Sequence, residues 1–553
     1  MLSIFCTLIV LLAAISGFGT LFLKIFSISE DGLAEKLIGG IFSITMIFTL
    51  LTFFLPLNFW VEILTVITGI SAFFFFMIYE NFIDFSKDNA KSAILILIAV
   101  FAVSFPPFIL DHFGYYVPSI LWLREIGLVK GISNLDLVLG QMSFWHIFQA
   151  GFSNFTDTAL KINILPLVIF IIYCYEKRQF LPLIFLPILF LFSQSPSPDL
   201  AVLAFSIILL LEILNGSKNL KWLFALSVFI FAIKPTMIWP PIFVMLYGIT
   251  ILKNFRIGSL GIFVMIIFIT KNIYCFGYPI FPLTYFDLNL PWKPNSEVMK
   301  ISANIAVQKT YDMQYSGEEI ANFTFGERIS NWFFLPGIKA VIHWLFTISL
   351  FFFTIFTFRK NNTLIKIIYF SLIIKCILVL ITSAQYRFFI DVFFVIITVI
   401  FYEKSKLKIW NKLAFGGSLV VLFFLSYPKI LNQMVPSFRL SAMMRGFKTE
   451  QLWIPKVYNA VQFETHQIGN LKFNFSTNYP LSYSTPVPAI SPDRFIEYRD
   501  AKIFPQLIDN QNIRSGFHHE KLSEKDLEKL NQIISQQMEK LQKNSRQNAG
   551  NNQ

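Results

Sequence analysis

Apolar segments long enough to cross a lipid bilayer recur along most of this chain. A helix needs roughly 17–25 apolar residues to cross the hydrocarbon core, and about fourteen segments between residues 2 and 427 approach that composition. Only 14% of the 553 residues are charged and 55% are hydrophobic, whereas soluble domains carry about 25% charged residues. We therefore exclude a soluble core. We predict an all-α polytopic membrane protein with about 14 transmembrane helices, extracytoplasmic loops and a small C-terminal extracytoplasmic region.

The basic residues indicate the orientation of the predicted bundle. If the N-terminus is outside, the inside loops contain Lys24, Lys36, Lys87, Lys91, Lys177, Arg178, Lys218, Lys221, Arg359, Lys360, Lys404 and Lys406. The outside links at 58–59, 193–198 and 384–386 contain no Lys or Arg. Because Lys and Arg in short loops stay in the cytoplasm, we predict a multi-pass protein of the bacterial cytoplasmic (inner) membrane with both termini extracytoplasmic.

The net charge of +12 lies mostly in these short loops. We therefore expect membrane lipids as partners and no nucleic acid. The four cysteines are scattered without a CxxC spacing, which indicates neither a disulfide framework nor a zinc site.

The predicted orientation divides the chain into five regions. These are N-terminal transmembrane helices at 1–110, a first large external loop with an amphipathic helix at 111–157, a transmembrane core at 158–427 with an external loop at 271–337, an external C-terminal lobe at 428–520, and an amphipathic helix with a disordered tail at 521–553.

Asp111 and His112 are the first candidates for catalysis, because Asp111 ends the predicted fourth span directly before this histidine. A negative charge is unfavourable at the C-terminal end of a helix, so its presence there favours a role as a base or metal ligand. The alternative is a solvated helix end. Tyr115 and Tyr116 follow as candidate substrate-binding residues.

Asp199 is a second acid at the outer end of a predicted span, preceded by Pro196 and Pro198. Prolines there prevent a helix from starting earlier. Asp199 as a simple helix N-cap is an equally good interpretation. Two acids at outer helix ends are what a two-carboxylate or metal-assisted site requires, and the sequence leaves the metal unknown.

Several cations and aromatic residues are predicted at the same face. Lys234, Lys271 and Arg387 are candidates for binding an anionic group, because Arg and Lys are the usual phosphate partners. Tyr278 lies in a Gly/Pro/aromatic loop that suits a lipid-lined cleft. The alternatives are Lys side chains that reach to the interface, an interfacial aromatic belt, and a structural ion pair between Arg387 and Asp391.

These residues, in this order, resemble the multispanning glycosyltransferases of the GT-C type. Those enzymes use lipid-phosphate-linked sugars and carry an essential acid in the first large external loop. The segments 111–150, Gly277–Pro282 with Trp292-Lys293-Pro294, and Gln385–Phe388 also look like a group of uncharacterised bacterial membrane proteins. The resemblance covers scattered short motifs between about residues 100 and 430.

The resemblance implies sugar transfer from a polyprenyl-phosphate-linked donor at the outer face of the membrane. Asp111 would act as the general base or metal-site acid, Asp199 as a second acid, and Arg387 or Lys234 would hold the lipid phosphate. Some members of this broad class use a divalent cation and others do not, so the cofactor stays open.

Two other functions fit the same architecture. A polysaccharide polymerase or ligase would rely on external Arg and His residues rather than on Asp111. A lipid-linked glycan transporter or flippase would place polar residues at mid-membrane, and Lys375, inside an apolar segment, is the feature that favours it.

The C-terminal region is less hydrophobic. Strand-like runs such as Leu471–Phe475 predict a small external lobe over residues 430–520. A capping pattern at Ser523 followed by apolar residues at helical spacing predicts an amphipathic helix, and residues 542–553 have the composition of a disordered tail. His518 and His519 could form a metal-binding pair, and we favour the alternative that both are surface residues.

Overall fold

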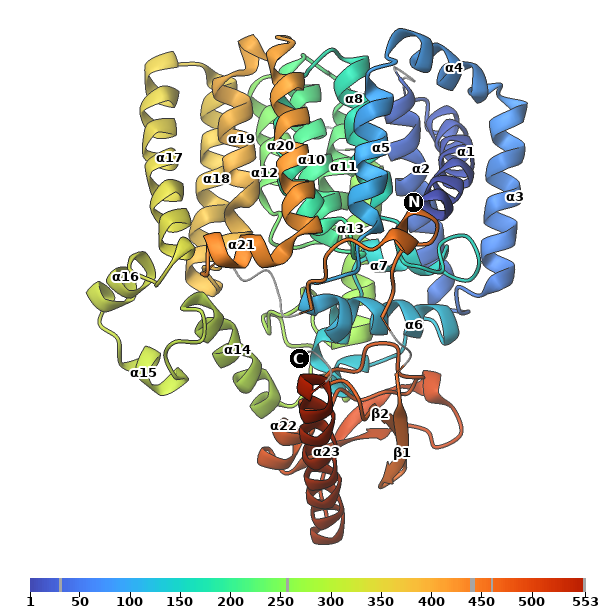
Figure 1. The fold of residues 1–553 in the computed structure, drawn as a ribbon, viewed down its shortest axis with the longest axis vertical. Coiled ribbons are helices and arrows are strands. Elements are labelled where there is room, and N and C mark those ends of the chain that lie inside the picture. Colours follow the sequence, from blue (N-terminus) through green and yellow to red (C-terminus); the bar gives the residue numbers. More distant parts are fainter. Residues whose placement is uncertain (29–31, 255–257, 438–442, 459–460, 551–553) are drawn as a thin grey trace.

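The structure, a computed structural model, describes residues 1–28, 32–254, 258–437, 443–458 and 461–550. It is mostly helical, which confirms the predicted all-α class for the bundle (Figure 1). The helices of the first half are α1 Leu2–Ile25, α2 Leu33–Thr52, α3 Phe59–Phe75, α4 Ile78–Asp88, α5 Ser92–Ser104, α6 Val117–Glu125, α7 Phe144–Ala150, α8 Ile164–Glu176, α9 Leu186–Leu189, α10 Pro198–Leu214, α11 Leu220–Ile233, α12 Trp239–Thr250 and α13 Ser259–Phe276. The remaining helices are α14 Ser296–Thr310, α15 Gly317–Asn322, α16 Phe325–Phe333, α17 Ile338–Lys360, α18 Thr363–Thr382, α19 Ile390–Ile400, α20 Ile409–Ser426, α21 Pro428–Met434, α22 Arg494–Asp500 and α23 Glu524–Gly550.

Six of the described helices are long and apolar enough to cross a membrane: α1, α2, α13, α17, α18 and α20. Helices α3 and α4, which meet at a bend of 72°, would make a seventh span if counted as one. The predicted number of about 14 spans is therefore not confirmed. Several predicted spans are shorter apolar helices, such as α5, α8, α11 and α12. The segment 181–192 is divided into short helical turns that contain Pro182 and Pro187, because proline removes a helical hydrogen bond.

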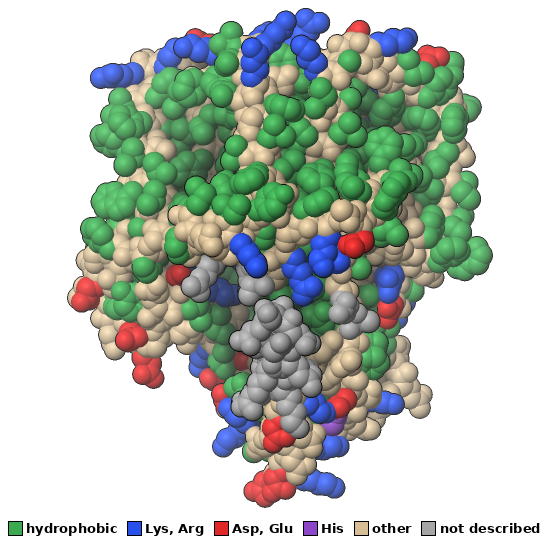
Figure 2. Space-filling view, viewed as in Figure 1, with side chains coloured by type: hydrophobic (Ala, Val, Ile, Leu, Met, Phe, Trp, Pro, Cys, Tyr) green, Lys and Arg blue, Asp and Glu red, His purple; other side chains and the backbone are tan. Residues whose placement is uncertain are grey.

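The short loops of the bundle meet at one end. Lys36 Nζ donates to Asn81, Lys177 lies 3.7 Å from Glu212, and the Tyr402 hydroxyl donates to Asn215. Figure 2 shows a broad band of hydrophobic side chains, with Lys and Arg side chains along this end. The charge distribution therefore follows the pattern that the loops predict, and the assignment of this end to the cytoplasm stays a prediction.

The long segments and both chain ends lie at the other end of the bundle (Figure 1). The N-terminal ammonium donates to the carbonyl of Gln451 at 2.5 Å, and helix α23 packs on the hairpin of the C-terminal lobe, where Lys540 pairs with Glu464. We call this the lobe end of the bundle.

The C-terminal lobe adds two antiparallel hairpins to the helices. Strands β1 Phe463–Ile468 and β2 Leu471–Ser476 pair with Phe463 opposite Ser476, and β3 Ile503–Leu507 and β4 Phe517–Lys521 pair with Ile503 opposite Lys521. The predicted strand-like run 471–475 lies in β2.

Helix α23 begins directly after Ser523, whose hydroxyl accepts from the Asp526 amide at 3.2 Å, as the capping pattern predicts. It continues to Gly550, into the segment whose composition predicts a tail. Residues 551–553 lie outside the described part of the chain.

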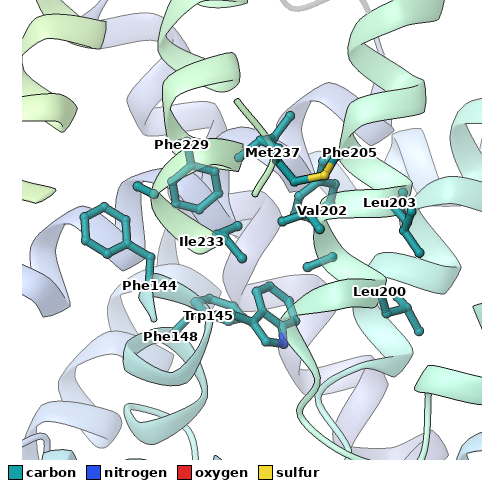
Figure 3. Packing of buried hydrophobic residues seen from close by; sticks show 14 of the residues in the cluster. Phe144, Trp145, Phe148, Leu200, Val202, Leu203, Phe205, Phe229, Ile233 and Met237 are labelled. Atoms are coloured by element: carbon teal, nitrogen blue, oxygen red, sulfur yellow. The ribbon is translucent and has the colours of Figure 1, made fainter. Parts of the chain in front are cut away.

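A short helix, α7, is buried beneath two bundle helices and fixes the ends that carry the site. Phe144, Trp145 and Phe148 of α7 pack among side chains from α10 and α11 (Figure 3). The Ser143 hydroxyl at the start of α7 donates to the carbonyl of Ile233, the last residue of α11, at 2.7 Å. The Trp145 indole donates to Asn163 at 2.7 Å. These contacts hold the lobe-side ends of α10 and α11 in place.

Candidate active site at the lobe end of the bundle

Asp111 and Arg387 form an ion pair between two distant segments. Arg387 lies in the short turn Tyr386–Phe389 that leads into α19, and its Nη1 donates to Asp111 Oδ2 at 2.9 Å. The Arg387 side chain is 31% exposed and the Asp111 side chain is 26% exposed. The buried Nε of Arg387 has no hydrogen-bond partner among the described residues, so the guanidinium has a donor left for a ligand.

Asp111 does not end a helix, as the sequence suggests, but begins one. Helix α5 stops at Ser104, before Pro106 and Pro107, and Asp111 is the N-terminal flanking residue of a single π-helical turn, His112–Tyr116, that continues into α6. The diproline explains the break, because proline disfavours helix in itself and in the residue before it. A carboxylate is favourable at this end of a helix, so the dipole argument for a functional Asp111 was wrong, and the case for Asp111 depends on its contacts.

Asp199 pairs with Lys234 beside the first pair. Lys234 follows the last residue of α11, and its ammonium group bonds to Asp199 in the first turn of α10. The N-cap of α10 is Ser197, whose hydroxyl accepts from the Asp199 amide at 3.3 Å, so the interpretation of Asp199 as the cap is wrong. The carbonyl of Ser197 accepts from Asn163 at 3.0 Å, which connects this turn to the support around α7.

One aromatic ring connects the two ion pairs. Phe388 lies 5.0 Å from Lys234 Nζ and 5.2 Å from the guanidinium carbon of Arg387, within the range of a cation–π contact. We call Asp111, Asp199, Lys234 and Arg387 the charged cluster. The role of Phe388 was missed from the sequence, where its position next to Arg387 is the only signal.

The side chains of two tyrosines and a histidine pack together next to the charged cluster. The Tyr116 hydroxyl lies 3.4 Å from the Ser197 hydroxyl, and the ring of Tyr115 packs edge-on against Tyr116 at 4.6 Å. The ring of His146 from α7 lies 5.0 Å from that of Tyr116. The predicted Tyr115 and Tyr116 are therefore next to the charged cluster.

Two other predicted site residues, His112 and Lys271, make their contacts with other parts of the protein. The ring of His112 is buried against Phe113 and Tyr483 of the lobe. The ammonium of Lys271 donates to the carbonyls of Gln141 and Met142. Both are structural interactions by their contacts.

Tyr278 lines an open groove with Asp287, Lys293 and the start of α14. No member of the charged cluster lines this groove.

Asp391 does not pair with Arg387. It pairs instead with Lys375 of α18 and accepts from the Trp239 indole at 2.8 Å. Lys375 also donates to the carbonyl of Phe388 at 2.7 Å. The predicted structural pair between Arg387 and Asp391 is therefore wrong, and the buried Lys375–Asp391 pair supports the turn that presents Arg387.

The charged cluster offers both acids and cations to a ligand. Among the described residues, no three His, Cys, Asp or Glu side chains come together as metal ligands. The cluster combines two carboxylates, which accept protons, with two cations, of which the guanidinium matches phosphate oxygens in a bidentate geometry. Such a set can bind a phosphate and hold a base beside it.

One family model matches this chain, and it covers all members of the charged cluster. The model, described as a domain of unknown function (DUF8201), matches residues 1–394. No curated protein and no solved structure matches the chain.

Proposed function

Because the chain belongs to the DUF8201 family, whose function is unknown, we propose a function from the chemistry of the charged cluster. The protein transfers a sugar from a polyprenyl-phosphate-linked donor to an acceptor hydroxyl at the outer face of a bacterial cytoplasmic membrane. The observation that carries this proposal is the meeting of Asp111, Asp199, Lys234 and Arg387 at the lobe end of an apolar bundle.

The cations supply the phosphate contacts. Arg387 Nε has no hydrogen-bond partner among the described residues, and Lys234 Nζ and the Arg387 guanidinium both lie near the ring of Phe388. A phosphate between them would receive charge-assisted hydrogen bonds, which are about twice as strong as neutral ones. The hydrophobic band of the bundle shown in Figure 2 would provide a place for the prenyl chain.

Asp111 acts as the general base. It takes the proton of the acceptor hydroxyl while the hydroxyl oxygen attacks the anomeric carbon of the sugar. The bond from that carbon to the phosphate oxygen breaks, and its electrons leave with the polyprenyl phosphate. Arg387 and Lys234 stabilise the charge that develops on the departing phosphate.

The exposure of the two pairs suggests how the base becomes free. An ion pair that is about a quarter to a third exposed, such as Asp111–Arg387, is screened by solvent more than a buried pair is. The side chains of Asp199 and Lys234 are each 12% exposed, so that pair is screened less. A donor phosphate would therefore displace Asp111 from Arg387, which releases the carboxylate beside the substrate.

Lys375, the residue that favoured the transporter alternative, has a partner within the bundle. Lys375 is neutralised by Asp391 within the bundle, and both side chains are almost completely buried, at 1% and 3% exposed. Buried pairs of this kind are ordinary structural elements as well as functional ones.

The test is sugar transfer by the purified protein in vesicles. The donor is a polyprenyl phosphate that carries a radiolabelled sugar, offered with an extract of cell-envelope glycans as acceptor, and free polyprenyl phosphate is measured as the second product. Asp111→Asn is expected to lower transfer by roughly 10²- to 10⁴-fold, the usual contribution of a general base.

Asp312→Asn is the matched control, because Asp312 pairs with Lys339 on the surface of the same end. It is expected to leave transfer unchanged. Full transfer by a folded Asp111→Asn protein would overturn the proposal.

A further inference from the structure

Helix α16 has one apolar face that the protein covers only in part. It lies below the lobe-side end of α17 (Figure 1) and begins with a capping box between Thr324 and Glu327. Phe325, Ile329 and Phe333 recur at every fourth residue, so they lie along one face of the helix.

The C-terminal half of this face packs on the bundle. Trp332 stacks on His343 of α17, with ring centroids 3.9 Å apart, and its indole donates to the carbonyl of Ala384 at 2.9 Å. Phe333 packs on Trp344 at 4.5 Å. This half is held by protein contacts.

The N-terminal half of the same face has no such cover. Phe325 is 81% exposed and Ile329 is 42% exposed. The adjoining turns of α17 expose Val341, Leu345 and Ile348, and α17 is one of the helices long and apolar enough to span a membrane. The uncovered residues therefore continue the surface that α17 would present to lipid.

We infer that α16 docks on the bilayer, with Phe325 and Ile329 inserted at the boundary between headgroups and acyl chains. An amphipathic helix of this kind lies in the interface plane and buries its apolar face about 5–10 Å into that boundary. Because the remaining residues of the face pack on spans of the bundle, the helix already lies at the level where the lipid begins.

Helix α21 also has exposed apolar side chains that would contact the bilayer. It exposes Ile430 and Met434, and the Ser437 hydroxyl, beyond its C-terminus, accepts from the amide of Ile338, the first residue of α17. The start of α17 is thus joined to both short helices.

Docking of α16 has a consequence that rests on the proposed function. Trp332 binds the carbonyl of Ala384, three residues before Arg387. The helix therefore connects the lipid surface to the turn that carries the phosphate-binding guanidinium. The docking itself does not depend on any activity of the charged cluster.

Nitroxide labels in the full-length protein, reconstituted in phosphatidylethanolamine–phosphatidylglycerol vesicles, test the inference. Cys6 is exposed and is replaced by Ser, whereas Cys174, Cys275 and Cys376 are buried. Labels are placed at Phe325→Cys and Ile329→Cys, with Asn331→Cys on the opposite side of α16 as the control. Collisions with oxygen, which concentrates in lipid, are compared with collisions with a water-soluble nickel complex.

Labels at 325 and 329 are expected to collide more with oxygen and to lose nickel collisions relative to 331. Two results would overturn the inference. Equal nickel access at all three positions would place the helix in water. Low access to both reagents at 325 and 329 would indicate a covering protein surface, such as a second copy of the chain. Sugar transfer does not enter this measurement, so its result is independent of the proposed function.

Discussion

Arg387 donates to Asp111 across 2.9 Å, although 276 residues separate the two in the sequence. Each side chain lies in a short turn at the lobe end, Asp111 after the break that follows α5 and Arg387 before α19. The contact therefore brings together two halves of the bundle. The Arg387 side chain is 31% exposed and the Asp111 side chain is 26% exposed, so solvent reaches both.

Exchanging the two charged residues distinguishes a structural role of the Asp111–Arg387 pair from a catalytic one. The double variant Asp111→Arg, Arg387→Asp keeps an ion pair but moves the base and the phosphate-binding cation. We expect it to fold like the parent and to lose sugar transfer by roughly 10²-fold or more, as do the single variants. Transfer assays with a size-exclusion check of folding measure this. Recovery of transfer in the double variant would show that the pair is structural.

Arg387→Lys tests the bidentate phosphate contact. Lysine keeps the charge but presents a point charge instead of a planar fork. We expect a higher KM for the polyprenyl-phosphate donor in this variant, and a further loss in Arg387→Gln, where the charge is absent. Donor titrations of the two variants are compared with those of Asp312→Asn. An unchanged KM in Arg387→Gln would be inconsistent with a phosphate at this residue.

The buried Lys375–Asp391 pair should matter for stability. Removing one partner of a buried pair leaves an uncompensated charge and costs on the order of 3–5 kcal/mol. Asp391→Asn is therefore expected to lower the thermal midpoint of the protein in detergent, and the double variant Lys375→Met, Asp391→Leu is expected to be less affected. If both variants unfold at the same temperature as the parent, the pair does not support the Arg387 turn as described.

The contact between β4 and the first external loop should weaken in acid. Burial lowers the pKa of His519 to about 3 from its usual 6.5, so the folded lobe keeps this ring neutral. The unfolded chain binds a proton more readily, and the stability from the neutral ring, present above about pH 6.5, is lost as the pH falls toward 3.

Asp136, in the first external loop, has the opposite effect on the pH dependence of stability. Burial raises its pKa to about 6 despite the nearby Arg494, so its contribution is present below about pH 3.8 and declines as the pH rises through 6. Comparing the parent with His519→Gln isolates the histidine. The protection factors of the amides of Phe517–Lys521, which correct for the slower intrinsic exchange at low pH, are expected to fall from pH 7 to pH 5 more in the parent than in the variant. An equal loss of protection in both proteins would exclude His519 as the cause.

The sequence predicted the components of the site better than their local geometry. Asp111, Asp199, Lys234 and Arg387 were each identified as polar residues at the outer ends of apolar segments, and they meet. The partners were not predictable, because whether Arg387 pairs with Asp391 or with a residue 276 positions away depends on packing. The predicted direction of the helix at Asp111 was also wrong, because α5 ends at Ser104, before Pro106 and Pro107, and a new helical turn begins at Asp111.

The predicted number of spans is not confirmed, for a related reason. Apolar composition shows that a segment is buried, but it does not distinguish lipid from protein surroundings. α11 is only 14 residues long, and nearly all of its side chains are buried among other helices. Hydrophobic runs such as 181–192 likewise form short turns inside the bundle. The lobe was predicted in outline from its composition, whereas its docking through Asn134, which donates to the carbonyls of Trp292 and Phe517, has no local signal.

Photolabelling with a polyprenyl phosphate tests the central claim most directly. A photoreactive group placed next to the phosphate is activated in vesicles that contain the parent, Arg387→Gln or Asp312→Asn protein, and labelled peptides are mapped by mass spectrometry. The account predicts labels within 111–116, 197–199, 234–237 or 385–388 in the parent and in Asp312→Asn, and their loss in Arg387→Gln. Labelling confined to the basic-loop end of the bundle, or undiminished labelling of Arg387→Gln, would contradict it.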